Sequence, residues 1–272
     1  MTDAFALPDG PALAAMLGKM IATALFVVII ALISERIGPF FGAMVASLPI
    51  YSGPIYLVLA FEHTPGYLAQ AALGSVAISG AMPVFSLIYC ALAPRFGMAF
   101  SLSGAVLGWV LAALAVRSHT WTIAGAALFC AVVYGAAVPL SRAFTRAAAV
   151  PQAPRGWIDL PLRAGLVAIF VGVVTALSKI LPPVTTGILS VVPIIFASLI
   201  LVLHPRVGGA ATAVLIAHSI AGMVGMCLAF IFVHLTIRDI GTGPALLMGL
   251  GISIAWNLLL IFAQQGLGWL RR

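Results

Sequence analysis

The sequence predicts an all-α protein, a polytopic transmembrane helical bundle of about nine spans. Of its 272 residues, 63% are hydrophobic and only 7% are charged, and the mean hydropathy is +1.22. A soluble domain has about 25% charged residues, so a water-soluble fold of this length could not cover its surface with so few charged side chains. The apolar runs are continuous rather than alternating, which excludes a membrane β-barrel.

The nine apolar runs are each close to the roughly 20 residues that a helix needs to cross a bilayer. They cover residues 13–34, 40–61, 67–93, 98–116, 120–140, 160–181, 184–203, 209–235 and 243–269. Clusters of glycine, proline and charged residues separate them, as turns require; these are residues 35–39, 62–66, 94–97, 117–119, 204–206 and 238–244. The polar stretch 141–163 is the predicted linker between two halves.

An internal repeat relates the two halves. One offset of 144 residues superposes Ser34 on Ser178, Pro39 on Pro183, Pro49 on Pro193 and Ile50 on Ile194. Similar motifs also occur in corresponding spans of the two halves, at 78–80 and 220–222 and, with the same Gly-to-Trp spacing, at 104–109 and 251–256. Spans 1–4 then correspond to spans 6–9, and span 5 joins them. Equivalent helices are five spans apart, which predicts inverted four-helix repeats, a pattern typical of secondary transporters. The alternative is chance matching of common apolar residues.

This repeat divides the chain into three parts. Residues 1–118 form the first half, residues 119–159 the connector span and cytoplasmic linker, and residues 160–272 the second half. All three belong to one integral membrane domain.

The repeated prolines indicate where a solute could bind. Proline inside a helix removes a hydrogen bond, and in a membrane the freed backbone groups must face protein or cavity water. Span 2 carries two prolines and span 7 carries one, so both are predicted to be broken near mid-membrane. The predicted substrate-binding residues are Pro49, Tyr51, Ser52, Gly53, Pro54, Ser190, Pro193 and Ser198, with Tyr51–Gly53 as unwound backbone. A simple kink is the alternative at each proline.

Three residues are candidates for coupling or gating. His218 lies within span 8, and its charge can change near neutral pH. An ionisable group at membrane depth suggests function, although a neutral histidine bonded to a neighbouring helix is an equally good interpretation. Glu35 and Lys179 occupy equivalent positions of the two repeats with opposite charge, which suggests a salt bridge or gate.

The distribution of basic residues predicts the orientation. Nine Lys and Arg residues fall on one side of the nine-span topology and four on the other. The positive-inside rule places the first set in the cytoplasm, so the N-terminus is expected outside and the C-terminus inside. The N-terminus has no basic segment before its first apolar run, so we expect the first helix to be retained.

The sequence lacks the motifs of several other classes. No GxxxxGK[ST] motif couples the chain to ATP, and no HExxH or GxSxG motif indicates a protease. The three cysteines lack the spacing of a zinc or redox site and are interpreted as small buried hydrophobes. We therefore expect no catalytic residue, no metal, no cofactor and no nucleic-acid partner.

Part of the chain resembles known membrane proteins. Residues 32–54 and the related residues 189–204 resemble the repeated motif of small GlpM-like bacterial inner-membrane proteins and of larger AbrB/LrgB-type membrane proteins. The resemblance covers about a quarter of the chain. It implies a bacterial inner-membrane protein of the transporter type, and it names no substrate.

These observations favour a small secondary transporter or exporter of an anionic or amphipathic organic solute, with protons as a candidate coupling ion. The first alternative is a non-transporting membrane scaffold or regulatory subunit, because abundant glycine suits close helix packing. The second is a channel or lipid flippase. The bilayer is the expected partner, and a homodimer is a further alternative.

Overall fold

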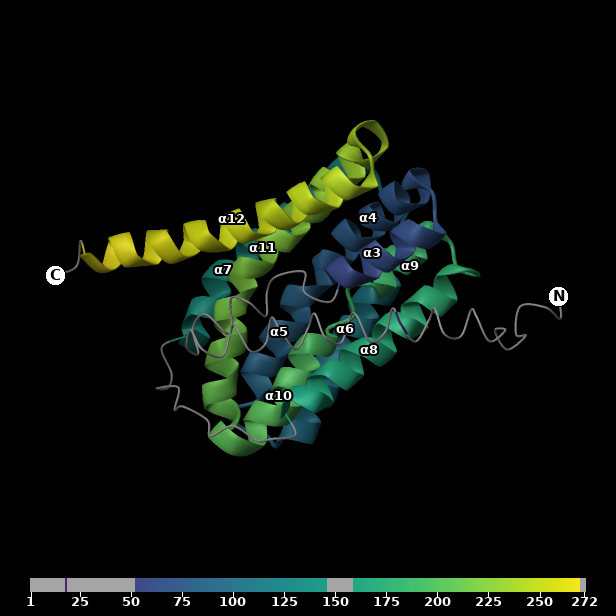
Figure 1. Ribbon diagram of the computed structural model, residues 1–272. Helices are drawn as coiled ribbons and strands as arrows, with labels where there is room; N and C mark the ends of the chain where they lie inside the picture. Colours follow the sequence, from purple (N-terminus) through teal and green to yellow (C-terminus); the bar gives the residue numbers. More distant parts are fainter. Residues whose placement is uncertain (1–17, 19–51, 146–158, 270–272) are drawn as a thin grey trace.

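The computed structural model describes residue 18, residues 52–145 and residues 159–269, and within them the regular structure is entirely helical. The helices are α3 (Ser52–Glu62), α4 (Pro65–Ser79), α5 (Ala81–Leu92), α6 (Met98–Arg117), α7 (Ile123–Thr145), α8 (Asp159–Ser178), α9 (Pro183–Leu189), α10 (Ile194–Val207), α11 (Gly209–Ile240) and α12 (Thr242–Trp269) (Figure 1).

Six helical segments of the described residues are long and apolar enough to cross a membrane. They are α4–α5, α6, α7, α9–α10, α11 and residues 242–263 of α12. This confirms the prediction of a membrane-type helical bundle, and the boundaries fall close to the predicted ones. Apart from residue 18, the first predicted span lies outside the described residues, as does most of the second, so the count of nine spans and the inverted repeat stay predictions.

The segments differ in how much of their surface other helices cover. In the most apolar stretch of α4–α5, 83% of the residues are buried, whereas in those of α6 and α7 only 22% are. The peripheral helices expose large apolar side chains, among them Leu107, Leu128 and Leu247, as a helix facing lipid does. The last helix, α12, packs on α11 and extends past the rest of the bundle (Figure 1). The centre is therefore built around α4–α5, with α11 and α9 packed against α4.

The first interruption in the central helices lies between α4 and α5. Pro83 has no N–H to bond to the Ser79 carbonyl one turn back. The Tyr134 hydroxyl of α7 donates to that carbonyl instead, at 3.0 Å. The Cys130 thiol, also of α7, donates to the Val76 carbonyl at 3.0 Å. Side chains of α7 thus satisfy the carbonyls at this break, as an apolar environment requires.

The second interruption lies between Leu189, where α9 ends, and Ile194, where α10 begins. The backbone tightens there, because Val191 bonds to the Ile188 carbonyl at 3.3 Å in a three-residue step. This leaves the carbonyl of Gly187 for other donors. The interruption sits at Pro193, so the broken helix that the sequence predicted for span 7 is present.

The two interrupted segments lie side by side and run in the same direction. Hydrogen bonds join Tyr67 to Thr186, Ser75 to the Gly187 carbonyl and Tyr89 to His204, so residue numbers rise together along both segments. We call this line of contact the seam (Figure 1). A parallel pair needs an odd number of crossings between its two segments. Since α6 and α7 make two, α8 must also traverse the bundle, in the opposite direction to the pair.

Candidate functional site

A polar layer lies on the seam, within the apolar bundle. The Tyr56 hydroxyl of α3 hydrogen-bonds the Ser75 hydroxyl at 2.8 Å, and Ser75 lies 3.0 Å from the Ser190 hydroxyl. Ser75 and Ser190 both donate to the Gly187 carbonyl, at 2.9 and 2.7 Å. The three side chains are at most 1% exposed. Two interrupted segments and α3 therefore share one buried group of hydroxyls and carbonyl oxygen, which we call the central layer.

Two glycines allow the segments to come this close. An ideal Cβ on Gly187 would overlap the Ala71 carbonyl of α4, and one on Gly74 would overlap the Val184 carbonyl of α9. The two backbones thus touch at reciprocal positions, as small residues permit in membrane helices. Gly74 immediately precedes Ser75, so the same contact brings the Ser75 hydroxyl onto the Gly187 carbonyl.

A second polar cluster closes one end of the seam. The Tyr67 hydroxyl hydrogen-bonds Thr186 at 2.7 Å and donates to the Ser178 carbonyl at 3.0 Å. His63 stacks on Tyr67, with ring centroids 3.9 Å apart, and its Nε2 lies 2.9 Å from the Ser178 hydroxyl. That hydroxyl donates to the Thr175 carbonyl, so His63 Nε2 carries the hydrogen.

Burial lowers the pKa of His63 below its ordinary value because it disfavours the charged ring; nearby Lys179 lowers it further and Glu62 opposes both. The neutral imidazole is therefore the form that fits this end of the seam. Lys179, a predicted gating residue, is exposed at this end.

A third cluster lies at the other end. The Tyr89 hydroxyl at the end of α5 bonds His204 Nδ1 of α10 at 2.8 Å, and Thr212 of α11 is its second side-chain partner. Tyr67 and Tyr89 are 22 residues apart along one helical segment, or about 33 Å at 1.5 Å per residue. This matches the roughly 30 Å hydrocarbon core of a bilayer, so tyrosine–histidine clusters lie at both ends and the central layer between them.

The predicted substrate-binding residues have different outcomes. Ser190 belongs to the central layer. Ser52, Gly53 and Pro54 lie in α3, so the expectation of unwound backbone is wrong for Ser52 and Gly53. The Ser52 hydroxyl is buried without a hydrogen-bond partner among the described residues.

The remaining predicted residues lie apart from the central layer or cannot be placed. Pro193 precedes α10, and Ser198 donates to the Ile195 carbonyl of its own helix. His218 Nδ1 donates to the Val214 carbonyl at 2.7 Å within α11. Pro49, Tyr51 and Glu35 lie outside the described residues.

Sequence reasoning missed the pairing of Tyr56 and Ser75 with Ser190, and the clusters at the two ends. Serine and threonine inside an apolar run were visible as signals, but they are common in membrane helices. The more specific signal was a glycine close to a hydroxyl residue in each segment, at 74–75 and at 187–190. Among the described residues, no group of three or more His, Cys, Asp and Glu side chains could hold a metal ion.

Comparison with known proteins adds no assignment. No protein-family model matches the chain, and neither the curated proteins nor the solved structures contain a significant match.

Proposed function

We propose that this chain is a small secondary transporter whose solute crosses along the seam. The observation that carries the proposal is the central layer, where two interrupted helical segments present buried hydroxyls and a carbonyl. Interrupted membrane helices that meet in this way form the midplane sites of many transporters. Backbone groups freed from helical bonding are tolerated in a membrane where they are buried in protein or line a cavity.

The proposed solute is a small anionic or amphipathic organic molecule. Among the described residues, the buried polar side chains of the bundle include serine, threonine and asparagine but no charged residue. Hydroxyl groups can donate to a solute oxygen or accept from a solute N–H. The start of α10 at the break adds the positive end of a helix dipole, which favours an anionic group. Protons are the proposed coupling ion, with His218 the candidate carrier.

The test begins with the purified protein and a library of small metabolites, because a ligand of the folded state raises the melting temperature. Each hit is then measured for uptake into liposomes by wild type, Ser190→Ala and Ser75→Ala. Ser253→Ala is the matched control, since Ser253 is buried on α12 without a partner among the described residues. We expect saturable uptake, lowered in the two seam variants and unchanged in the control.

Three results would each count against one part of this proposal. Equal uptake by all four proteins, at matched amounts in the liposomes, would remove the seam from the pathway. Uptake that rises linearly with solute concentration would favour a channel or flippase. A pH-dependent uptake that persists in His218→Gln would remove His218 from coupling.

The second candidate function is a membrane scaffold or regulatory subunit. The backbone contact at Gly74 and Gly187 favours it, because so close a packing also suits a rigid bundle. Stable co-purification with one partner protein, together with no ligand and no flux, would support the scaffold over the transporter.

We also propose the finer architecture that the sequence predicts: nine spans, inverted repeats, a bacterial inner membrane and an N-terminus outside. Helix alternation puts Arg95, Arg142 and Arg206 at the Tyr89 end of the seam, which supports that end as cytoplasmic. Introduced single cysteines in the 93–97 and 179–182 turns test this with a membrane-impermeant thiol reagent on intact cells. Labelling is expected only at 179–182.

A further inference from the structure

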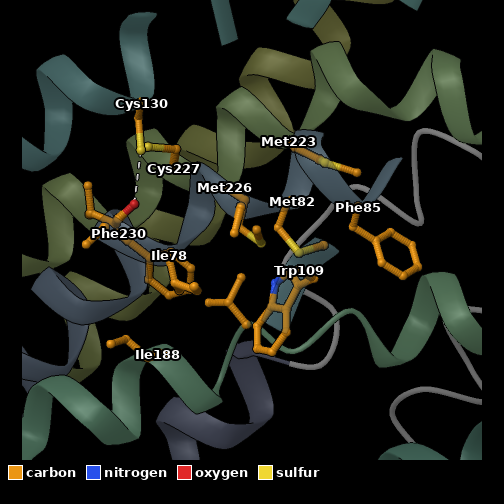
Figure 2. Close-up of a cluster of buried hydrophobic side chains, with 14 of the residues drawn as sticks. Ile78, Met82, Phe85, Trp109, Cys130, Ile188, Met223, Met226, Cys227 and Phe230 are labelled. Carbon is orange, nitrogen blue, oxygen red and sulfur yellow. Dashed lines mark hydrogen bonds between the residues drawn. The ribbon is translucent and has the colours of Figure 1, made fainter. Parts of the chain in front are cut away.

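Two buried thiols meet in the core, where α7 packs on α11. Cys130 is 2% exposed and Cys227 is 4% exposed, and both are free thiols. The Cys227 thiol has the Cys130 side chain as its hydrogen-bond partner, and Cys130 in turn donates to the Val76 carbonyl at 3.0 Å. Figure 2 shows the two sulfur atoms side by side, with the dashed bond from Cys130 to the carbonyl oxygen.

These contacts fix the direction of the chain of hydrogen bonds. The Cys130 hydrogen points to the carbonyl, which can only accept. The bond between the sulfurs must therefore be donated by Cys227 to a lone pair of Cys130. The Cys227 proton therefore lies between the two sulfur atoms, and the Cys130 thiol is itself bonded to the Val76 carbonyl of α4.

The two thiols lie in the apolar core of the bundle. The same buried cluster contains Met82, Met223, Met226 and Phe230 (Figure 2). An unpaired charge is costly in such a setting, so any ion that enters must form a neutral complex with its ligands. Soft thiolate and thioether sulfur favours soft ions such as Cu(I) over hard ones.

We propose that Cys130 and Cys227 form a binding site for one soft monovalent d10 cation, which replaces the proton between their sulfurs. The Cys227 S–H bond breaks and its proton leaves to solvent. A metal–sulfur bond forms to the resulting thiolate, and Cys130 binds through its lone pair as a neutral thiol. One positive charge enters and one leaves, no electron is transferred, and the Cys130–Val76 hydrogen bond is kept.

The geometry suits a two-coordinate ion. With metal–sulfur bonds near 2.3 Å, as for zinc thiolates, a linear S–metal–S unit separates the sulfurs by about 4.6 Å. Thiols in hydrogen-bond contact already lie within about 1 Å of that separation, so side-chain rotation suffices. The bound ion would link α7 to α11 beside the break between α4 and α5. The site is independent of the proposed transport, because its binding assay needs no flux.

The experiment uses the full chain, purified under reducing conditions and freed of reductant, with Ag(I) as a redox-inert probe of this ion class. Native mass spectrometry gives the number of ions bound, a weakly buffered titration gives the protons released, and thermal melting gives the stabilisation. The variants are Cys130→Ser and Cys227→Ala. Cys90→Ser is the matched control, because its buried thiol bonds only the Ala213 carbonyl among the described residues.

We expect wild type and Cys90→Ser to bind one tight Ag(I) per chain, release one proton and melt at a higher temperature. Loss of either sulfur should weaken binding roughly a hundredfold or more, the upper range for disturbing even an outer-shell partner. Cys227→Ala removes only a donor, so it keeps the proposal testable if Cys130→Ser folds poorly.

Three results would overturn the proposal: no tight Ag(I) in wild type, undiminished binding in Cys227→Ala, or an equal loss in Cys90→Ser. Release of two protons per ion would overturn the neutral bridge and require two thiolates.

Discussion

The α4 and α9 backbones touch at Gly187 and Gly74, and Gly187→Ala tests this contact directly. The new Cβ would overlap the Ala71 carbonyl, a backbone atom that cannot rotate away, so α4 and α9 must separate. Overpacking a core in this way costs about 1–3 kcal/mol. Separation also stretches the hydrogen bond from Ser75 to the Gly187 carbonyl, which is worth about 0.5–1.5 kcal/mol. The alanine gives back about 0.5–1 kcal/mol of helix stability.

These contributions leave a net loss of about 2 kcal/mol. At about 2–4 °C per kcal/mol, typical of chains of 150–250 residues, Gly187→Ala should melt about 4–8 °C below wild type. The assay is thermal unfolding of the purified protein in detergent, followed by intrinsic fluorescence. Gly74→Ala, which meets the Val184 carbonyl from the opposite side, should behave alike.

The control is Gly135→Ala, at an exposed position of α7 where an added Cβ meets nothing within 4 Å. It should melt at or slightly above the wild-type temperature, since alanine is the better helix former. If Gly187→Ala melted within about 2 °C of wild type while Gly135→Ala behaved as expected, the backbone contact would be wrong, and the central layer with it.

Two further predictions concern the first break and one end of the seam. Tyr134→Phe leaves the Ser79 carbonyl buried without its hydroxyl donor and should cost about 1–3 kcal/mol of stability. Adding Pro83→Ala restores a backbone N–H at the break between α4 and α5, so a double-mutant cycle of melting temperatures should show the second change offsetting the first. Strictly additive effects would contradict this explanation. Because the pKa of His63 is lowered in the folded chain, the unfolded chain takes up a proton near pH 6.5 before the folded one does, so stability should fall as the pH drops below about 6.5. His63→Gln should flatten this part of a profile of melting temperature against pH. An unchanged slope would assign the pH dependence to another histidine.

Sequence patterns predicted the helices well, and their interruptions less completely. Hydropathy located α6, α7, α11 and α12 because each is one uninterrupted apolar run bounded by charge or glycine. The break at Pro193 was predicted because proline removes a backbone donor. The same rule applies to Pro83, but that proline lies in a long apolar run and has no counterpart in the repeat, so no break was predicted there.

The central layer could be predicted only in part. Ser190 was identified from its place beside the repeated proline. Its partners Tyr56 and Ser75 depend on which helices are neighbours and on the register of a parallel contact, and neither is encoded locally. The wrong expectation at Ser52 and Gly53 has a similar origin, because two prolines that frame a short segment are equally compatible with helical backbone between them.

The parallel seam has a consequence for synthesis. Ser75 and Tyr67 are made 112 and 119 residues before their partners Gly187 and Thr186. At about 5–20 residues per second, α9 is synthesised about 6–24 s after these two hydroxyl residues. A nascent chain that ends before residue 183 would therefore lack the α9 partners of two hydroxyl groups on its most buried helix. The first half depends on the second to finish folding, and translation speed through residues 75–190 sets how long it stays open to proteolysis.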